Sequence, residues 1–243
     1  FNLIKDNYLN LNLAGGGFLG SLSISSSHNN SIIRGVINNS GKYAIYTVGI
    51  TYNNSFVNIS LVNSNSSFGD LRFANVINDT YFVDMPHIGN YSFFVGTSST
   101  IIVVDSRYGE IRFLQGVNGS GTNFSRDIRI TDNFAEVRSN INAGLNRSAN
   151  VTLYNIGNRG FGKPAILRDG IKCPLGVCYN FTSLIAQNVT FNVSYWTNYS
   201  IGEGNIAPNI SKVFINSTLG TNKTKDDLNC FGILLDNDLN DRI

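Results

Sequence analysis

The sequence has few of the features that would place it in several common protein classes. It has 18 Lys and Arg against 16 Asp and Glu, a net charge of +2, and no run of basic residues. A nucleic-acid-binding protein is therefore not expected. No window of about 18 apolar residues occurs, so no membrane-spanning helix is expected. The chain begins FNLIKD without a secretion signal. We expect either that a signal was removed or that the segment comes from a longer chain.

Helix formers and common catalytic motifs are also lacking. Ala and Glu are scarce, and no stretch shows sustained 3.6-residue periodicity, so an α-helical fold is not expected. The chain has no Ser/His/Asp set, no P-loop and no G-x-G-x-x-G fingerprint. The GGG run at 15–17 precedes no helical pattern, so it indicates a turn rather than a phosphate-binding loop.

The chain does contain strand-like segments at a fixed spacing of 24 residues, at 6–13, 30–37, 54–61 and 78–85. Their alternate positions form columns, the first of which is Leu9, Ile33, Val57 and Tyr81, with Ile101 and Val103 as a fifth level. A second series of strands lies between them, at Leu22, Tyr46, Leu71 and Tyr91.

This repeat predicts an all-β fold that begins with a parallel β-helix of about five coils over 1–114. Parallel crossovers are almost always right-handed, so a right-handed β-helix is expected. An antiparallel sandwich with evenly spaced strands is the alternative. Over 115–204 the repeat ends, and short strands near 128–130, 135–139, 149–156, 164–167, 179–184 and 188–196 predict a small antiparallel β-sandwich that caps the coils. Residues 205–243 hold two strand-like runs, 210–216 and 228–235, too few to bury a core.

The surface is rich in asparagine within N-x-S/T sequons, the acceptor of N-glycosylation in exported proteins. Asn occurs 36 times and Ser and Thr together 39 times, so chance would give about 6 sequons, whereas 18 are present. Their asparagines are Asn29, Asn38, Asn53, Asn58, Asn65, Asn78, Asn90, Asn118, Asn123, Asn146, Asn150, Asn180, Asn188, Asn192, Asn198, Asn209, Asn216 and Asn222.

A structural role for these asparagines is the alternative. Asn tolerates the left-handed conformation at β-helix corners, and it can also form ladders inside the coils, which would account for the sequons near 29, 53 and 78. That explanation does not cover 187–202. There Val189, Phe191, Val193 and Tyr195 alternate with polar residues, so they would face the core. We therefore expect glycans on the outer face, at Asn188, Asn192 and Asn198.

Several segments resemble the tail module of secreted surface proteins from uncultivated archaea. They are YGEIRFL (108–114), the run 125–161, PAILRDGIKC (164–173), CYNFTSL (178–184) and VTFNVSYWTNYSIGEG (189–204). The resemblance implies pectin-lyase-like β-helix coils before the module. It also implies Ig-like repeats after it, beginning with a phrase similar to PNISKVFINST (208–218). A typical repeat would continue past Ile243, so 205–243 would be a partial Ig-like segment. The resemblance implies an archaeal secreted or cell-surface glycoprotein and brings no catalytic motif.

The three cysteines are consistent with export. Cys173 and Cys178 enclose the turn-forming sequence PLGV, a spacing that favours a local disulfide. Free thiols or a metal site are the alternatives, but zinc needs further ligands, and His28 and His87 lie in other parts of the chain. Cys230 is left over, so it would bond to another chain or lack its partner.

Two weaker site candidates involve acidic residues. Polysaccharide-cleaving β-helices group acidic and basic residues on one face, and the candidates are Asp70, Asp79, Asp84, Asp105, Arg34, Arg72 and Arg107. Asp84 and Asp105 would be neighbours if their coils stack with a 21-residue offset, and paired carboxylates can act as general acid and base. Solvated or turn residues are the alternative. The DNDLND segment offers Asp236, Asp238, Asn240 and Asp241 to calcium, but lacks the Gly and Glu of an EF-hand, and a hydrophilic turn is the alternative.

Two functions follow. The first is a structural, heavily N-glycosylated subunit of an archaeal extracellular filament, appendage or surface layer, without enzymatic activity or a cofactor. Its partners would be identical subunits, joined by strand pairing through 206–243, and other surface proteins or carbohydrate. A fragment whose missing residues cap both ends is the alternative to such assembly. The second function is a secreted β-helix that binds or cleaves carbohydrate.

Overall fold

The computed structural model describes residues 2–10, 20–38, 41–62, 67–75, 77–93, 99–204, 209–217 and 228–235. Within these residues the fold is almost entirely β, with one α-helix, α1 (Phe124–Asp127), and one 3-10 helix, η1 (Ala143–Leu145). The chain divides into two compact units, Phe1–Gly202 and Glu203–Ile243.

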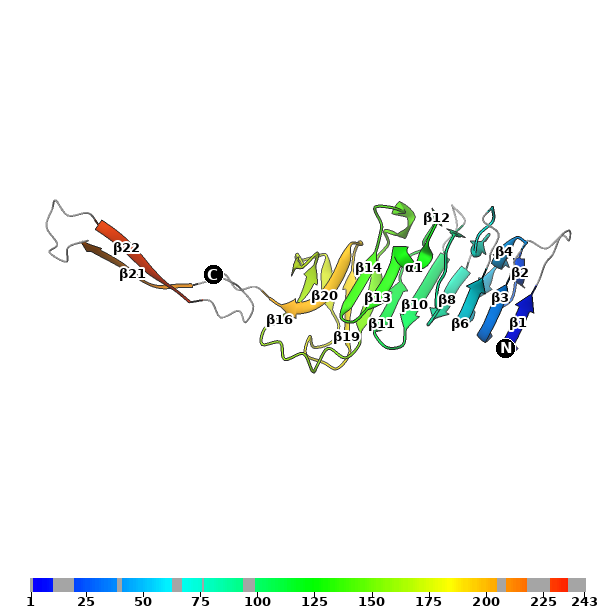
Figure 1. Cartoon of the computed structure of the whole chain (residues 1–243), viewed down its shortest axis with the longest axis horizontal. Helices are drawn as coiled ribbons and strands as arrows, with labels where there is room; N and C mark the ends of the chain where they lie inside the picture. The colour runs from blue at the N-terminus through cyan, green and yellow to red at the C-terminus, as the bar shows by residue number, and fades with distance from the viewer. Residues whose placement is uncertain are drawn as a thin grey trace. The chain divides into compact units, whose positions relative to one another are not determined.

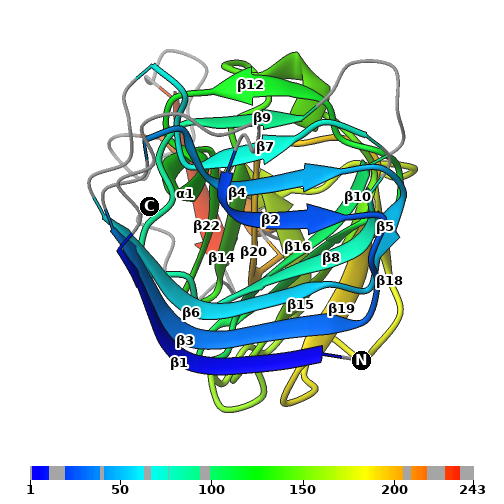
Figure 2. The ribbon, with the colours of Figure 1, turned by 90° about the vertical axis from the view of Figure 1, so that its right-hand side faces the viewer.

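The first part of unit 1 is a parallel β-helix, which confirms the fold expected from the repeat. Its strands stack side by side from coil to coil (Figure 1), and a view along the coils shows two parallel sheets, A and B, opposite each other (Figure 2). The parallel strands of sheet A are β1 (Asn2–Asn10), β3 (Asn30–Asn38), β6 (Ser55–Val62), β8 (Ile77–Val83) and β10 (Ser99–Asp105). Those of sheet B are β2 (Gly20–Ser25), β4 (Tyr43–Val48), β7 (Leu71–Phe73) and β9 (Tyr91–Phe93). The short β5 (Thr51–Tyr52) also pairs with β8. The parallel strand β10 has no parallel counterpart in sheet B. Among the described residues, four coils therefore have a strand in both sheets, one fewer than the five predicted.

The pairing of neighbouring coils in sheet A departs from a constant spacing. Ile33 pairs with Val57, as predicted. Leu9 pairs with Ile37 rather than with Ile33, so the first coil is longer than the predicted repeat. The prediction for Leu9 was therefore wrong, although its strand does pair with β3.

The later coils shift as well. Val57 pairs with Val83, so the predicted pairing of Val57 with Tyr81 was wrong and this coil is also longer than the repeat. Tyr81 instead pairs with Ile102, the residue after the predicted Ile101. In sheet B, Leu22 lies beside Ile45 and not beside Tyr46. Leu71 and Tyr91 pair as predicted.

An inward row of large apolar side chains explains this register. Ile32, Phe56 and Phe82 are paired in sequence across β3, β6 and β8, and all three are buried. The rings of Phe56 and Phe82 stack with their centroids 5.7 Å apart. Ile33 and Val57 belong to the adjacent, outward row and are half-buried. Since the buried aromatic rings must superpose, the inward row determines which residues pair.

Residues in the left-handed conformation lie at corresponding corners of successive coils. Arg34, Asn58 and Asp84 each have φ of +49°, and the pairing of the residues before them places them on neighbouring strands. Asn29 and Asn53 have φ of +57° and +53°. Asn tolerates this conformation better than most residues, so the corner role proposed for sequon asparagines is confirmed at these two positions and at Asn58.

A ladder of asparagine side chains runs inside the coils. Asn2 Nδ2 donates to Asn30 Oδ1 (3.0 Å), and Asn30 Nδ2 donates to Asn54 Oδ1 (2.9 Å). Asn54 in turn donates to the Ser27 carbonyl (3.0 Å). Asn30 and Asn54 are buried, so this ladder satisfies polar groups that would otherwise be costly to bury. The predicted internal ladder is present, but it contains no acceptor asparagine of a sequon. Asn30 and Asn54 directly follow the acceptors Asn29 and Asn53, and Asn2 belongs to no sequon.

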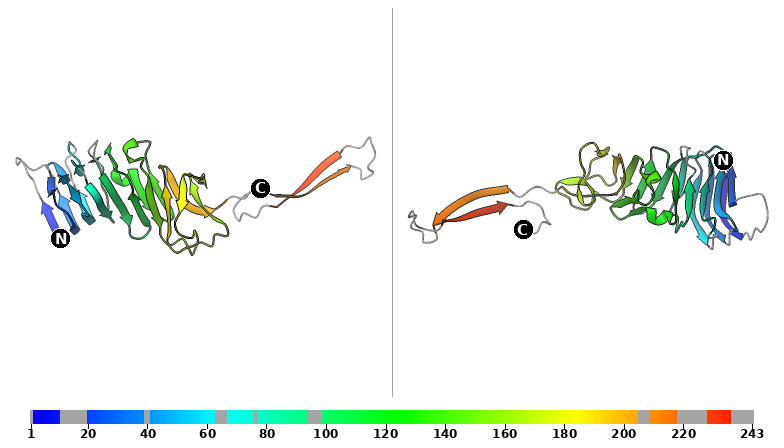
Figure 3. Two further views of the ribbon diagram at one scale, coloured as in Figure 1. Left: turned by 180° about the vertical axis from the view of Figure 1, so that it is seen from behind. Right: turned by 90° about the horizontal axis from the view of Figure 1, so that it is seen from above.

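The sheets then continue as antiparallel strands, the first of which pairs with β10 and lies within the range 1–114 that was predicted for the coils. Sheet A is extended by β11 (Gly109–Phe113), β15 (Ala149–Leu153), β19 (Val189–Val193) and β18 (Cys178–Asn180). Sheet B gains β12 (Gly119–Gly121). A third sheet, C, is built from β13 (Ile128–Thr131), β14 (Phe134–Val137), β20 (Asn198–Glu203), β16 (Pro164–Arg168) and β17 (Ile171–Lys172). The coils and these strands form one row when seen from behind (Figure 3).

Aromatic side chains join the antiparallel layers and connect them to the coils. Phe191 of sheet A packs against Tyr199 of sheet C, with ring centroids 6.3 Å apart. Phe82 of the last coils packs against Phe124 of α1 at 5.3 Å. One continuous apolar core therefore runs from the coils into the antiparallel strands.

The alternation expected in 187–202 holds only in part. Val189, Phe191 and Val193 are fully buried, as predicted. Tyr195 is exposed, contrary to the prediction, because β19 ends at Val193 and the chain bends, so that Trp196 enters the core instead. The disulfide predicted from the spacing of Cys173 and Cys178 is present.

Unit 2 contains an antiparallel ribbon of β21 (Asn209–Ser217) and β22 (Leu228–Leu235). Both strand-like runs predicted here are confirmed. No further strand of an Ig-like repeat is found among the described residues of this unit. Residues 236–243, and with them the calcium candidates Asp236, Asp238, Asn240 and Asp241, lie outside the described residues, as do Asn65 and Asn222.

The internal ladder predicts the effect of one substitution. Asn54→Ala would remove the acceptor of the Asn30 backbone N–H and of one Asn30 side-chain N–H, and would leave the Ser27 carbonyl without the Asn54 donor. We expect the free energy of unfolding to fall by about 1–3 kcal/mol, measured by urea denaturation. Asn75→Ala, on the exposed surface, is the control and should change it by less than about 0.5 kcal/mol. Equal effects of the two substitutions would contradict the role of the ladder.

Candidate functional site

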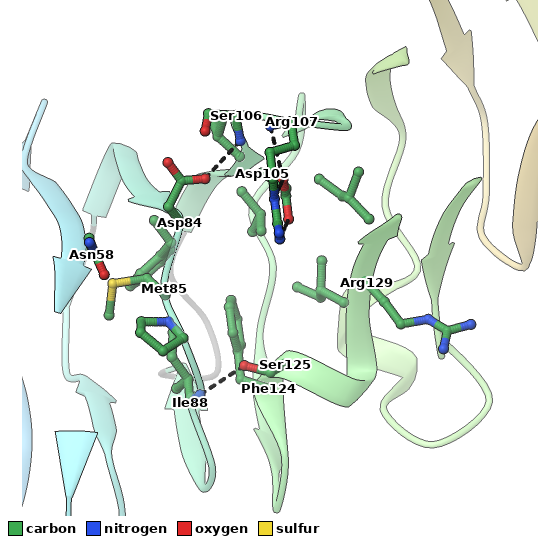
Figure 4. A pocket seen from close by; sticks show the side chains of 16 residues that line it. Asn58, Asp84, Met85, Ile88, Asp105, Ser106, Arg107, Phe124, Ser125 and Arg129 are labelled. Atoms are coloured by element: carbon green, nitrogen blue, oxygen red, sulfur yellow. Dashed lines mark hydrogen bonds and ion pairs between the residues drawn. The ribbon is translucent and has the colours of Figure 1, made fainter. Parts of the chain in front are cut away.

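A pocket of about 520 Å³ lies where the last coils meet the antiparallel strands of unit 1. We call it the corner pocket (Figure 4). Its polar residues are Asn58, Asp84, Asp105, Ser106, Arg107, Ser125 and Arg129. Its apolar walls come from β8 and the segment after it, from β10, from α1 and from β13. They include Phe82, Met85, Pro86, Ile88, Val103, Val104, Phe124, Ile128 and Ile130.

The strand register brings Asp84 and Asp105 to this pocket. Val83 pairs with Val104, and this is the offset at which the sequence predicted that the two aspartates would be neighbours. The Asp84 amide donates to the Val104 carbonyl (2.9 Å), which fixes the corner after β8. This part of the sequence-based prediction is confirmed.

Both carboxylates are engaged by nearby donors. Asp84 Oδ1 accepts a hydrogen bond from the Ser106 amide at 2.7 Å. Asp105 accepts from the amide and the guanidinium of Arg107, each at 3.0 Å. The hydrogen bond that the Arg107 guanidinium donates to Asp105 raises the pKa of Arg107 above its usual value. These contacts are those of turn-stabilising residues, which favours the structural alternative for the acidic pair.

The other candidates for polysaccharide cleavage do not line the pocket. Asp70 is buried and its Oδ2 accepts from the Gly89 amide (2.5 Å). Arg72 donates to Ser92 in sheet B, and Asp79 lies 3.9 Å from Arg112. Arg34 is an exposed corner residue of β3. The expected acidic and basic cluster is therefore reduced to Asp84, Asp105 and Arg107.

A buried polar network supports the α1 wall of the pocket. The Tyr91 hydroxyl donates to Asp127 Oδ2 (3.1 Å) and accepts from Asn142 Nδ2 (3.1 Å). Asp127 is fully buried and forms an ion pair with Arg126 at 3.2 Å. Burial raises the pKa of Tyr91 well above its usual range. The network joins β9, α1 and the segment before η1, so it fixes the position of Phe124.

The sequon asparagines lie at the surface wherever the structure describes their side chains. Asn29, Asn53, Asn58, Asn78, Asn146, Asn180 and Asn188 are exposed. Asn38, Asn90, Asn118, Asn123, Asn150, Asn192 and Asn198 are half-buried. Asn209 and Asn216 belong to β21, but their side chains lie outside the described set.

Several of these amides are already hydrogen-bonded. Asn192 Nδ2 donates both to the Ala149 carbonyl and to Asn150 Oδ1, each at 3.1 Å. Asn198 Nδ2 donates to Asp169 (2.9 Å). Asn188 has no such contact among the described residues and is exposed. Of the three asparagines predicted to carry glycans, Asn188 is therefore the most accessible acceptor, because the side-chain amides of Asn192 and Asn198 already donate hydrogen bonds.

Sequence reasoning missed most of the pocket walls. Met85, Phe124 and Arg129 come from a corner, a four-residue helix and an antiparallel strand, and no repeat connects them. Among the described residues, no group of three or more His, Cys, Asp or Glu side chains could hold a metal ion. In the same residues, no helix is long and apolar enough to span a membrane.

Comparisons with protein-family models, with curated proteins and with solved structures gave no match to this chain.

The network beneath the pocket predicts a pH-dependent loss of stability. Tyr91→Phe would leave Asp127 Oδ2 without its donor and Asn142 Nδ2 without its acceptor. The free energy of unfolding at pH 7 should therefore fall by about 1–3 kcal/mol. The raised pKa means that folding favours the neutral phenol. The contribution of Tyr91 to the free energy of unfolding is fully present below about pH 10, where the tyrosine of the unfolded chain is neutral. This contribution is lost as the pH rises above that value, because the unfolded chain then ionises first.

Urea denaturation at pH 7 and pH 11 measures both effects. Wild type should lose more stability between these values than Tyr91→Phe does. Tyr179→Phe, at an exposed ring, is the control and should behave as wild type. Identical pH dependence in all three proteins would contradict the assignment.

Proposed function

We propose that this chain is a structural, N-glycosylated subunit of an extracellular assembly, in which copies of the chain associate. The resemblance of its segments to archaeal secreted proteins suggests a filament, appendage or surface layer as that assembly. No enzymatic activity or cofactor is part of the proposal.

The observation that carries this proposal is the distribution of asparagine between surface and core. The buried asparagines of the described residues are Asn30, Asn54 and Asn142, and none of them is the acceptor asparagine of a sequon. None of the fourteen sequon asparagines with described side chains is buried. The internal ladder therefore does not account for the acceptor asparagines, although the corner role accounts for Asn29, Asn53 and Asn58. The accessibility of the other acceptors supports their selection for N-glycosylation.

The disulfide adds independent support for export. Disulfides persist in oxidising, extracellular environments and are rare where thiols are kept reduced. The bond between Cys173 and Cys178 connects the segment after β17 at the edge of sheet C to β18 at the edge of sheet A. It therefore holds together the end strands of two sheets.

Carbohydrate binding or cleavage is the second candidate, and the corner pocket is the observation that favours it. A volume of about 520 Å³ with apolar walls and a few polar groups is typical of a ligand site. Cleavage would need one carboxylate free to act as an acid and another as a base or nucleophile. The contacts of Asp84 with Ser106 and of Asp105 with Arg107 argue for binding over cleavage.

Peptide mapping of protein from its native source tests the glycosylation. We expect a glycan at Asn188, which is exposed, and lower occupancy at Asn192, whose amide donates two hydrogen bonds. Attachment at Asn192 would replace one N–H and weaken its contacts with β15. Unmodified asparagine at every exposed sequon would refute the proposal, and higher occupancy at Asn192 than at Asn188 would refute the ranking.

The ribbon of unit 2 generates a prediction about assembly. Val213, Phe214 and Ile215 are consecutive on β21 and all exposed, so both faces of the ribbon carry apolar side chains. A two-stranded ribbon is at best marginally stable alone. We propose that another copy of the chain covers it by strand pairing.

Deletion of residues 206–243 should abolish the assemblies seen by negative-stain imaging and sedimentation velocity. The circular dichroism of the remaining residues should still show folded β structure, since the continuous core lies within unit 1. Normal assembly of the deleted form would show that the ribbon does not join subunits.

A further inference from the structure

We infer that the corner pocket binds the first sugar residues of a glycan attached to Asn58 of the same chain. This inference rests on the proposed function, because it requires that sequons of this chain carry glycans. It goes further by assigning one of them to a defined binding site.

The position of Asn58 is the first argument. Asn58 is exposed, belongs to the sequon Asn58-Ile59-Ser60, and is itself part of the pocket lining. Figure 4 shows it beside Met85 at one side of the pocket, across from Arg129. Its left-handed conformation is fixed by the corner between Val57 and the buried Ile59. A sugar linked to this side chain would begin at the pocket rim.

The chemistry of the pocket fits a neutral sugar. A pyranose has C–H faces that pack on apolar walls, such as those of Met85 and Val103. Its hydroxyl groups donate to carboxylates and accept from guanidinium groups, which Asp84 and Arg107 provide at the rim. The carboxylates of Asp84 and Asp105 accompany the guanidinium of Arg107, whereas the Arg129 side chain extends away from the pocket (Figure 4) and pairs with Glu136, so an anionic ligand is not favoured.

Covalent attachment of the sugar to Asn58 would compensate for a low affinity of the pocket for sugar. An open pocket of this size would hold a free monosaccharide weakly, and dilute sugar would leave it mostly empty. A ligand joined by a short linker has an effective concentration in the millimolar range, so the attached sugar would occupy the same pocket without high affinity. Of the described sequon asparagines, Asn58 alone lines this pocket.

Met85 provides a specific probe, because it is the single methionine in the chain. We would express the full chain in a glycosylating host with methyl-¹³C methionine and record its one methyl resonance. Nuclear Overhauser effects from this methyl to sugar protons are expected in the wild type. Peptide mapping of the same preparation reports the occupancy of Asn58.

Three variants identify the source of the sugar. Ser60→Ala removes the sequon without changing the left-handed Asn58, and the sugar contacts of Met85 should disappear. Ser60→Thr retains the sequon and should retain the contacts. Asn188→Gln removes a glycan outside the pocket and should leave the Met85 resonance unchanged. The Met85 methyl resonance of the Ser60→Ala variant should match that of the wild type expressed without glycosylation.

The outcomes separate this inference from the proposed function. An occupied Asn58 without sugar contacts at Met85 would overturn the inference and leave the glycoprotein proposal intact. An unmodified Asn58 beside other occupied sequons would do the same. Sugar contacts that persist in Ser60→Ala would show binding of another glycan and would also overturn it. Absence of glycans from every sequon in native material would overturn both.

Discussion

Parallel pairing of β3, β6, β8 and β10 around a buried aromatic row is the constraint on which the rest of unit 1 depends. Phe56 and Phe82 stack inside the coils, and Phe82 also contacts Phe124 of α1. Because interiors are close-packed, this row leaves little freedom for a neighbouring strand to slip. The unequal offsets between successive coils follow from it. They place Asn58, Asp84 and Asp105 on adjacent strands at one corner, which creates the pocket.

The same strands show how far the sequence could predict the register. Alternation of apolar and polar residues normally specifies which face is buried, and a slip of one residue would reverse it. Here the outward row is also apolar, since Ile33, Val57, Val83 and Val104 pair in succession and none packs against the core. The pattern therefore identified the strands but not their inward face. Ile33 and Val57 were paired correctly because the coil between them has the length of the repeat, whereas the longer coils before β3 and after β6 were not recognised.

One part of the candidate site could be predicted from the sequence and another part could not. Asp84 and Asp105 could be foreseen as neighbours, since both follow strands of the repeat and a single offset connects them. The walls from α1 and β13 could not, because they belong to antiparallel segments without a common spacing. Whether Asp84 and Asp105 are free to act as general acid and base depends on which donors contact them, and only the structure shows those contacts. Donation from Ser106 to Asp84 and from Arg107 to Asp105 depends on the turn after β10, and residue types alone do not indicate it.

The outward aliphatic row also bears on why sugars would suit this surface. Ile33, Val57, Val83 and Val104 form a half-buried apolar strip across four parallel strands. Exposed apolar strips on sheets favour unwanted association. Asn58 directly follows Val57 and so lies beside an inner member of this strip, and Asn29 and Asn53 lie at the corners before β3 and β6. Glycans at these positions would flank the strip with hydrated groups and leave the strand hydrogen bonds intact. Under the proposed function, sugars on the coils would limit contact between sheet faces, and the apolar ribbon of unit 2 would be the surface through which copies associate.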